Sequence, residues 1–111
     1  MSAVTTHVLD TARGRPGTEI AVTLEALDGP HRTLIAEGRT DGDGRIAALG
    51  PEQLASGDYQ LTFDTGEYFA RTGTETFYPL VQVRFRLADP EQHYHVPLLL
   101  SPFSYSTYRG S

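Results

Sequence analysis

Residues 57–73 read GDYQLTFDTGEYFARTG, a stretch that contains the two local patterns from which the fold is predicted. Its first half alternates large apolar residues with polar ones, the apolar members being Tyr59, Leu61 and Phe63. Such alternation is typical of a strand with one buried face. Asp64 then lies three residues before Glu67, which is the spacing of a helix capping box. We therefore predict a strand followed by one short helix, roughly 65–72, the only helix expected in the chain.

Two other segments, 19–27 and 81–87, alternate with the same period of two. Their apolar members are Ile20, Val22, Leu24 and Ala26 in the first, and Val81, Val83, Phe85 and Leu87 in the second. Turn-forming Asp, Gly and Pro residues separate the apolar runs, and hairpin connections are expected at 28–30 and 41–44. These short strands predict an all-β, two-layer sandwich. The length of 111 residues suggests a single domain covering 1–111.

Composition narrows the range of functions. The formal net charge is −5 and no Lys/Arg-rich run exists, so binding to nucleic acid is not expected. No apolar stretch approaches the ~20 residues of a membrane span, so no membrane partner is expected either. The absence of cysteine excludes disulfides and thiolate metal sites. Neither a secretory signal at the start nor a peroxisomal Ser-Lys-Leu at the end is visible, so we expect a cytoplasmic protein.

Three histidines are candidates for chemistry. His7 falls in a predicted strand near the start, where it could simply be a satisfied polar residue. His93 and His95 are two residues apart, so in a strand they lie on one face. Such a pair could form half of a zinc site, with His7 as the obvious third ligand, or could place a general base beside a substrate.

Arg45 and the last segment are further candidates. Arg45 follows the Asp/Gly turn and could direct its guanidinium at a developing oxyanion, or could be an ordinary surface charge. The turn is not a calcium loop, because Ile46 occupies the sixth position, where that motif requires Gly. Residues 94–111 are rich in aromatic and hydroxyl groups and are predicted to form a packed final strand. The alternative is pairing at a sheet edge or against another subunit.

Three segments together resemble one family: HVLDTARGRPG (7–17), RTDGDGRI (39–46) and YHVPLLLSPFSYSTYRGS (94–111). They are similar to the signature blocks of the 5-hydroxyisourate hydrolases, also called transthyretin-related proteins. The ending YRGS is the most specific element, because the hormone carrier transthyretin lacks it. The sequence Arg15-Pro16-Gly17 departs from the Pro-Ala that is usual in the first block.

This resemblance implies a transthyretin-like two-sheet β-sandwich of about eight strands with one short helix. It implies a homotetramer, assembled as a dimer of dimers, with active sites where subunits meet. The implied reaction is hydrolysis of 5-hydroxyisourate to 2-oxo-4-hydroxy-4-carboxy-5-ureidoimidazoline in urate (purine) degradation. The implied mechanism is attack of a histidine-activated water on a ring amide, without a cofactor or metal.

Matched residue by residue, the family's functional positions fall on the candidates above and on the tail. The implied catalytic residues are His7, Arg45, His95 and Ser111. The implied substrate-binding residues are His7, Arg45, Tyr108, Arg109 and Gly110. Which histidine acts as the general base stays open.

Three alternatives remain at this point. The same sandwich could carry a small aromatic ligand, in which case an apolar lining is expected. A plain immunoglobulin-like interaction domain would have no histidines in a cleft. A zinc hydrolase would bring His7, His93 and His95 together around one ion.

Overall fold

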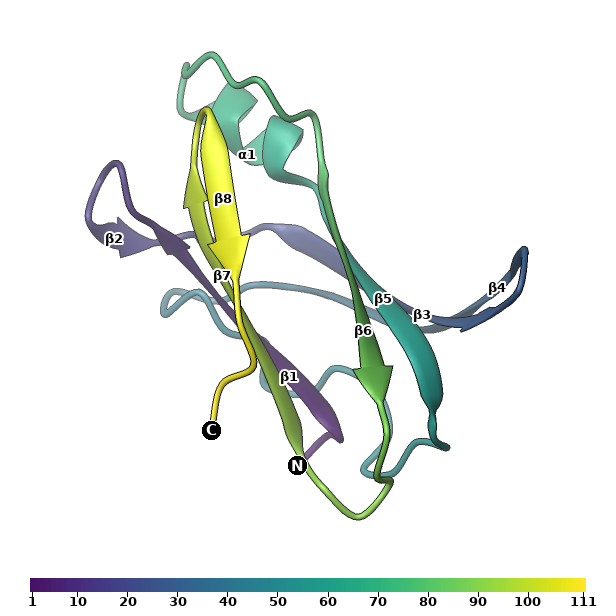
Figure 1. Ribbon diagram of the computed structural model, residues 1–111. Helices are drawn as coiled ribbons and strands as arrows, with labels where there is room; N and C mark the ends of the chain where they lie inside the picture. Colours follow the sequence, from purple (N-terminus) through teal and green to yellow (C-terminus); the bar gives the residue numbers. More distant parts are fainter.

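The computed structural model describes all residues 1–111, which form eight strands and one helix. Figure 1 shows how these elements are arranged. The elements are β1 (Val4–Asp10), β2 (Arg15–Pro16), β3 (Ala21–Asp28), β4 (His31–Arg39), β5 (Gly57–Phe63), α1 (Thr65–Arg71), β6 (Val81–Leu87), β7 (Tyr94–Ser101) and β8 (Ser104–Thr107). The strands form two sheets, ordered β2-β1-β7-β8 and β4-β3-β5-β6. The predicted two-sheet, all-β sandwich is confirmed. No helix is long and apolar enough to cross a bilayer.

The alternating segments became strands as predicted, and one of the two predicted hairpin connections is confirmed. In β5, Tyr59, Leu61 and Phe63 are buried, and a tight turn at Gly29 joins β3 to β4. The hairpin connection predicted at 41–44 is wrong. The chain after this turn pairs instead with β1, through a single bridge between Arg45 and His7.

The core lies between the two sheets and contains 19 buried apolar residues. Its largest fully buried side chains include Phe63, Phe69, Leu24 and Leu61. On β7, Tyr94, Val96 and Leu98 point into this core. The residues between them face outward, so the core fixes a rigid strand whose outer face is free to carry polar groups.

The last strand differs from its prediction. All four residues of β8 are exposed, although the strand pairs with β7. The packing expected over 94–111 is confirmed for β7 but wrong for β8, which pairs at the sheet edge as the alternative expected. Within the chain, Tyr105 contacts only the ring of Tyr78 edge-on, at 5.1 Å between centroids, and stays partly exposed.

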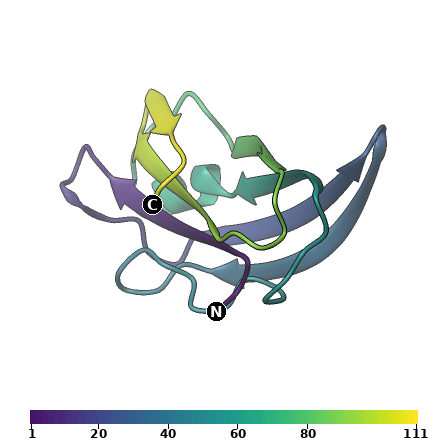
Figure 2. The same ribbon diagram turned by 60° about the horizontal axis from the view of Figure 1, so that its bottom comes forward.

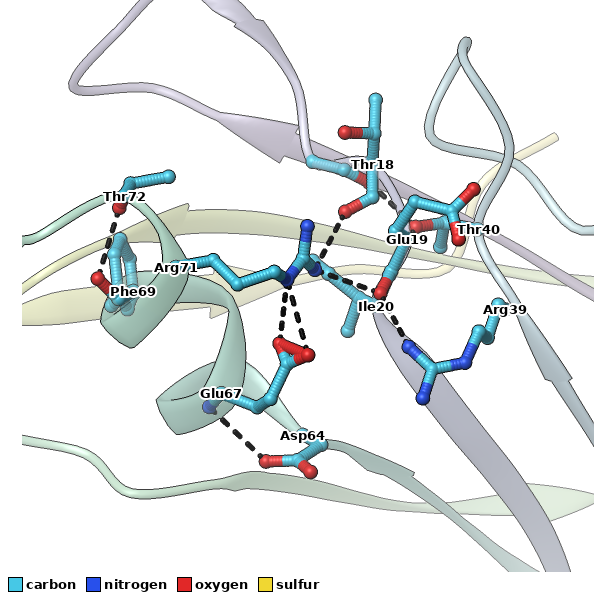
Figure 3. Close-up of polar contacts among 11 residues, drawn as sticks. Thr18, Glu19, Ile20, Arg39, Thr40, Asp64, Glu67, Phe69, Arg71 and Thr72 are labelled. Atoms are coloured by element: carbon cyan, nitrogen blue, oxygen red, sulfur yellow. Dashed lines mark hydrogen bonds and ion pairs between the residues drawn. The ribbon is translucent and has the colours of Figure 1, made fainter.

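Helix α1 is held at its start and end by charged side chains (Figure 3). The Asp64 carboxylate accepts a hydrogen bond from the Glu67 N–H, as the capping pattern predicts. Near the end, Arg71 pairs with Glu67 and donates to the Glu19 carbonyl at 2.8 Å. Arg39 donates to the same carbonyl at 3.0 Å. Glu19 is the only non-glycine residue with positive φ, at 58°, and these two guanidinium groups hold it there.

A buried hydrogen bond ties β1 to α1. The Tyr68 hydroxyl donates to Asp10 Oδ2 at 2.6 Å, and the Arg13 N–H donates to Oδ1 at 3.1 Å. Asp10 is 1 % exposed and Tyr68 3 %. Burial and the adjacent Asp10 carboxylate raise the pKa of Tyr68 to about 12. This carboxylate therefore depends on the phenol for one of its two protein donors.

We expect Tyr68→Phe to lower the free energy of unfolding by about 1–3 kcal/mol, because a buried acceptor loses its donor. Urea denaturation at fixed protein concentration measures the change. The matched control is Tyr105→Phe, since the Tyr105 hydroxyl lies on exposed β8 and has no protein hydrogen-bond partner. Equal stability of the two variants would contradict a structural role for the bond.

Candidate active site

The parallel pairing of β1 with β7 sets the position of the candidate site. Thr5 lies opposite His95 in this register, and His7 lies opposite Pro97. Because side chains alternate along a strand, Thr5, His7 and His95 share the outer face of the sheet. Figure 1 shows the two strands running side by side at the centre of that sheet. Residues about 90 positions apart in the sequence are thereby placed next to each other.

Two further segments flank this pair of strands. Arg45 forms an isolated bridge with His7 on one side, and Gly110 forms one with His95 on the other. The Gly110 N–H donates to the His95 carbonyl at 2.8 Å, and the Val8 N–H donates to the Gly44 carbonyl at 2.8 Å. Figure 2 shows the C-terminal segment lying over the same sheet as β1. Main-chain hydrogen bonds thus align four separate segments of the chain.

The Asp/Gly turn is built to place Arg45. The Asp41 carboxylate accepts hydrogen bonds from the N–H groups of Asp43 and Arg45, at 2.8 and 3.0 Å. These bonds hold the pKa of the Asp41 carboxyl below its usual range. Gly44 has φ of 77°, and a side chain there would collide with the Val8 carbonyl oxygen. Glycine therefore lets the turn dock against β1.

A depression of about 620 Å³ opens on this face of the molecule. It is lined by Met1, Thr5, Thr6, Asp41, Arg45, Ile46, Ala47, His93, His95 and Ser111. Only three of these ten residues are apolar. The lining is therefore unlike the apolar wall expected of a carrier for an aromatic ligand. A cleft with histidines also differs from what a plain interaction domain predicts.

His95 is the histidine best suited to accept a proton. It is half-buried, and its pKa is lowered by burial and then by the positive charges of Arg45, His7 and His93. The imidazole is therefore neutral at pH 7, as a general base requires. Its Nδ1 is hydrogen bonded to the Thr5 hydroxyl at 2.8 Å. Its Nε2 has no protein partner.

His7 is already engaged with the main chain. Its Nε2 lies 2.8 Å from the Asp43 carbonyl oxygen, which can only accept a hydrogen bond. The Nε2 of His7 must therefore carry a proton, and only Nδ1 is left as a lone pair when the ring is neutral. His7 is not among the residues that line the depression, although its backbone lies directly beside Arg45.

Arg45 brings a positive charge to the depression, where the Asp41 carboxylate is near but forms no salt bridge with it. Its backbone N–H is hydrogen bonded to Asp41, but its guanidinium forms no ion pair or hydrogen bond with the protein. The group is exposed and lowers the pKa of His95. A free guanidinium next to a neutral imidazole can hold an anionic oxygen while the imidazole takes up a proton.

The structure separates the four tail positions into two groups. Gly110 and Ser111 lie with His95, whereas Tyr108 and Arg109 line a different groove, of about 330 Å³, between the tail and β6. The Arg109 guanidinium lies 4.4 Å over the Tyr94 ring and donates to the Gln92 side chain at 2.9 Å. Within one chain, Arg109 therefore fastens the segment before β7.

Thr5 is the site residue that sequence reasoning missed. Its hydroxyl is hydrogen bonded to His93 Nε2 at 2.9 Å as well as to His95. The available signal was its spacing of two from His7, which places both residues on one face of a strand. The contact also bears on the zinc alternative, because a hydroxyl lies between the two histidines. No group of three His, Asp or Glu side chains is arranged to hold a metal ion.

Comparison with known proteins supports one family. The 5-hydroxyisourate hydrolase of Ralstonia nicotianae is 48% identical over 117 residues, and the match covers 100% of both chains. The structure of Klebsiella pneumoniae 5-hydroxyisourate hydrolase has a TM-score of 0.86 and 38% identity, covering 97% of this chain and 98% of that one. A transthyretin from Sparus aurata has a TM-score of 0.92 and 33% identity, covering 99% and 97%.

A longer protein also contains this fold. An (S)-allantoin synthase structure matches 97% of this chain with a TM-score of 0.88 and 43% identity, but this chain spans only 43% of its length. The family model described as HIUase/Transthyretin matches residues 4–110. Since that match covers nearly the whole chain, and full-length relatives are close to half identical, the chain belongs to the HIUase/Transthyretin family.

Proposed function

We propose that this protein hydrolyses 5-hydroxyisourate to 2-oxo-4-hydroxy-4-carboxy-5-ureidoimidazoline, a step of urate degradation. The observation that carries the proposal is the depression in which an unpaired Arg45 guanidinium and a neutral His95 imidazole meet. The full-length relative named 5-hydroxyisourate hydrolase adds the identity of the substrate. The reaction needs an activated water and a site for oxyanion charge, and these two side chains supply them.

In the proposed mechanism, His95 Nε2 removes a proton from water while the water oxygen attacks a carbonyl carbon of the six-membered ring. Arg45 stabilises the negative charge that develops on the carbonyl oxygen. The ring C–N bond then breaks, and the proton held by His95 passes to the leaving nitrogen. The other fragment is left as a carboxylic acid, which loses its remaining proton to solvent. Because the His7 Nε2–H is donated to the Asp43 carbonyl, His7 is proposed to contact the substrate through Nδ1. No step uses a metal or cofactor.

The remaining expectations from the sequence stay proposals. Ser111 lines the depression and is proposed to orient the water, and Gly110 is proposed to approach the substrate through its backbone. Tyr108 and Arg109 would reach a substrate only from a site shared between copies, because within one chain they line another groove. A cytoplasmic location and a single functional domain over 1–111 are likewise proposed.

Activity is tested directly by producing 5-hydroxyisourate with urate oxidase and following its ultraviolet decay with and without the protein. We expect a large acceleration, and His95→Asn should lower kcat by about 10²–10⁴-fold because a positioned base is removed. The matched control is His31→Asn, since His31 is exposed on β4 in the other sheet. Decay at the spontaneous rate with wild-type protein would refute the proposed function.

The pH dependence tests the charge arrangement around His95. The groups that face this imidazole are Arg45, His7 and His93, with Asp41 also lining the depression. Because the pKa of His95 lies below its ordinary 6.5, kcat/KM should stay high at pH 6.5 and fall only at lower pH.

We expect Arg45→Gln to lower kcat. We also expect the fall of kcat/KM at acidic pH to begin at a higher pH than in the wild type. Removing a nearby positive charge makes protonation of the imidazole easier, so its pKa rises. The measurement is kcat/KM between pH 5 and 8 for both proteins. If kcat/KM fell at the same acidic pH in the wild type and in the variant, a group other than His95 would be responsible for the pH dependence.

We propose a homotetramer arranged as a dimer of dimers. Edge strands β6 and β8 have unpaired backbone groups, and large apolar side chains are exposed beside them. Phe77, Leu80 and Phe103 are 68%, 45% and 61% exposed. Sedimentation velocity should give a mass near four times the 12.2 kDa chain. A single species of monomer mass at micromolar concentration would contradict this assembly.

A further inference from the structure

The Thr5 hydroxyl joins two histidines. Its Oγ1 lies 2.8 Å from His95 Nδ1 and 2.9 Å from His93 Nε2. The residue is half-buried on β1, whereas His93 is exposed just before β7. A hydroxyl can accept two hydrogen bonds but has only one proton to donate. It can therefore donate to only one of the two imidazoles, and the other must supply its own N–H.

Because the Thr5 hydroxyl has one proton, the tautomers of His93 and His95 depend on each other. If Thr5 donates to His93 Nε2, His95 must be protonated at Nδ1, and its Nε2 is a free lone pair. If Thr5 donates to His95 Nδ1, His95 must be protonated at Nε2 and cannot act there as a base. The direction of one hydroxyl proton thus decides what His95 can do.

Only the first arrangement is compatible with His95 as the general base. Nε2 is the ring nitrogen without a protein partner, and it must be unprotonated to take up a proton.

The opposite edge of the ring is closed by the tail. A Cβ on Gly110 would lie 2.6 Å from His95 Cδ2, so the glycine backbone packs directly against that edge. With Nδ1 held by Thr5 and Cδ2 covered by Gly110, the ring cannot turn over. Only the edge with Cε1 and Nε2 is left to face the depression that His95 lines.

We propose that Thr5 is a positioning residue: its hydroxyl accepts the Nδ1–H of His95, donates to His93 Nε2, and thereby keeps His95 Nε2 unprotonated toward the substrate. This inference rests on the proposed hydrolase function with His95 as base. It gives His93, which also lines the depression, an indirect role: His93 accepts the Thr5 hydroxyl proton, which would otherwise be donated to His95 Nδ1.

Imidazole ¹⁵N NMR of the full chain without substrate tests the tautomer directly. In the wild type at pH 7.5 we expect His95 Nδ1 to have the shift of a protonated nitrogen and Nε2 that of an unprotonated one. Thr5→Val, which keeps a β-branched strand former, should give a mixture of tautomers. Thr5→Ser should restore the wild-type pattern, because it restores the hydroxyl.

The variant His93→Ala provides the sharper outcome. It leaves the Thr5 hydroxyl proton without its acceptor, so that proton can turn to His95 Nδ1 and move the His95 population toward the Nε2–H tautomer. His31→Ala is the matched control and should leave His95 unchanged. A wild-type His95 protonated at Nε2, or no shift in either Thr5→Val or His93→Ala, would overturn the proposal.

Kinetics provide the second readout. Thr5→Val and His93→Ala should lower kcat roughly 10-fold with little change in KM, a part of the ~10²–10⁴-fold supplied by a positioned base. Thr5→Ser should recover most of the rate. If the wild type does not hydrolyse 5-hydroxyisourate, the proposed function fails while the tautomer result stands. If it does hydrolyse it and the tautomers do not respond, only the positioning role fails.

Discussion

The parallel pairing of β1 with β7 is the constraint on which the rest of this structure depends. Both strands turn one face into the shared core, and their register places Thr5 beside His95. A slip by one residue would turn every outward side chain into the core, which the buried Val4, Val8 and Leu98 forbid. The register of an apolar core therefore also fixes the geometry of a polar site on the other face.

Both flanking segments are attached to this pair through the backbone rather than through side chains. Gly44 and Gly110 approach strands closely where any side chain would collide. Because the backbone holds both segments in place, the Arg45 guanidinium and the His95 Nε2 are not needed for hydrogen bonds within the protein. It also explains why short, glycine-containing motifs stand next to the residues that we propose to be catalytic.

Much of the fold could be predicted from local patterns, because alternation and capping act over a few residues. Within residues 57–73, the strand and the helix predicted from the sequence lie close to their observed limits. The turn at 41–44 was misread as a hairpin, since a sequence does not say which strand follows a turn in space. The exposure of β8 was missed for a similar reason, as aromatic content does not reveal whether a partner surface exists.

The candidate site was only partly predictable. Residue type singled out His7, Arg45 and His95, and the family resemblance added the tail. Thr5 was not found, because the role of its hydroxyl depends on contacts with His93 and His95 that only the folded structure reveals. Fold similarity alone would not have decided the function either, since a transthyretin superimposes as well as a hydrolase.

The sheet order has a consequence for the time at which the site appears. The sheet β4-β3-β5-β6 is built from strands that are close in the chain, and its hairpins can form during synthesis. The other sheet needs β7 between β1 and β8, and β7 is the next-to-last strand to emerge from the ribosome. We expect nascent chains to be inactive until Gly110 and Ser111 are also free, with the unpaired β1 as the surface that a chaperone would bind.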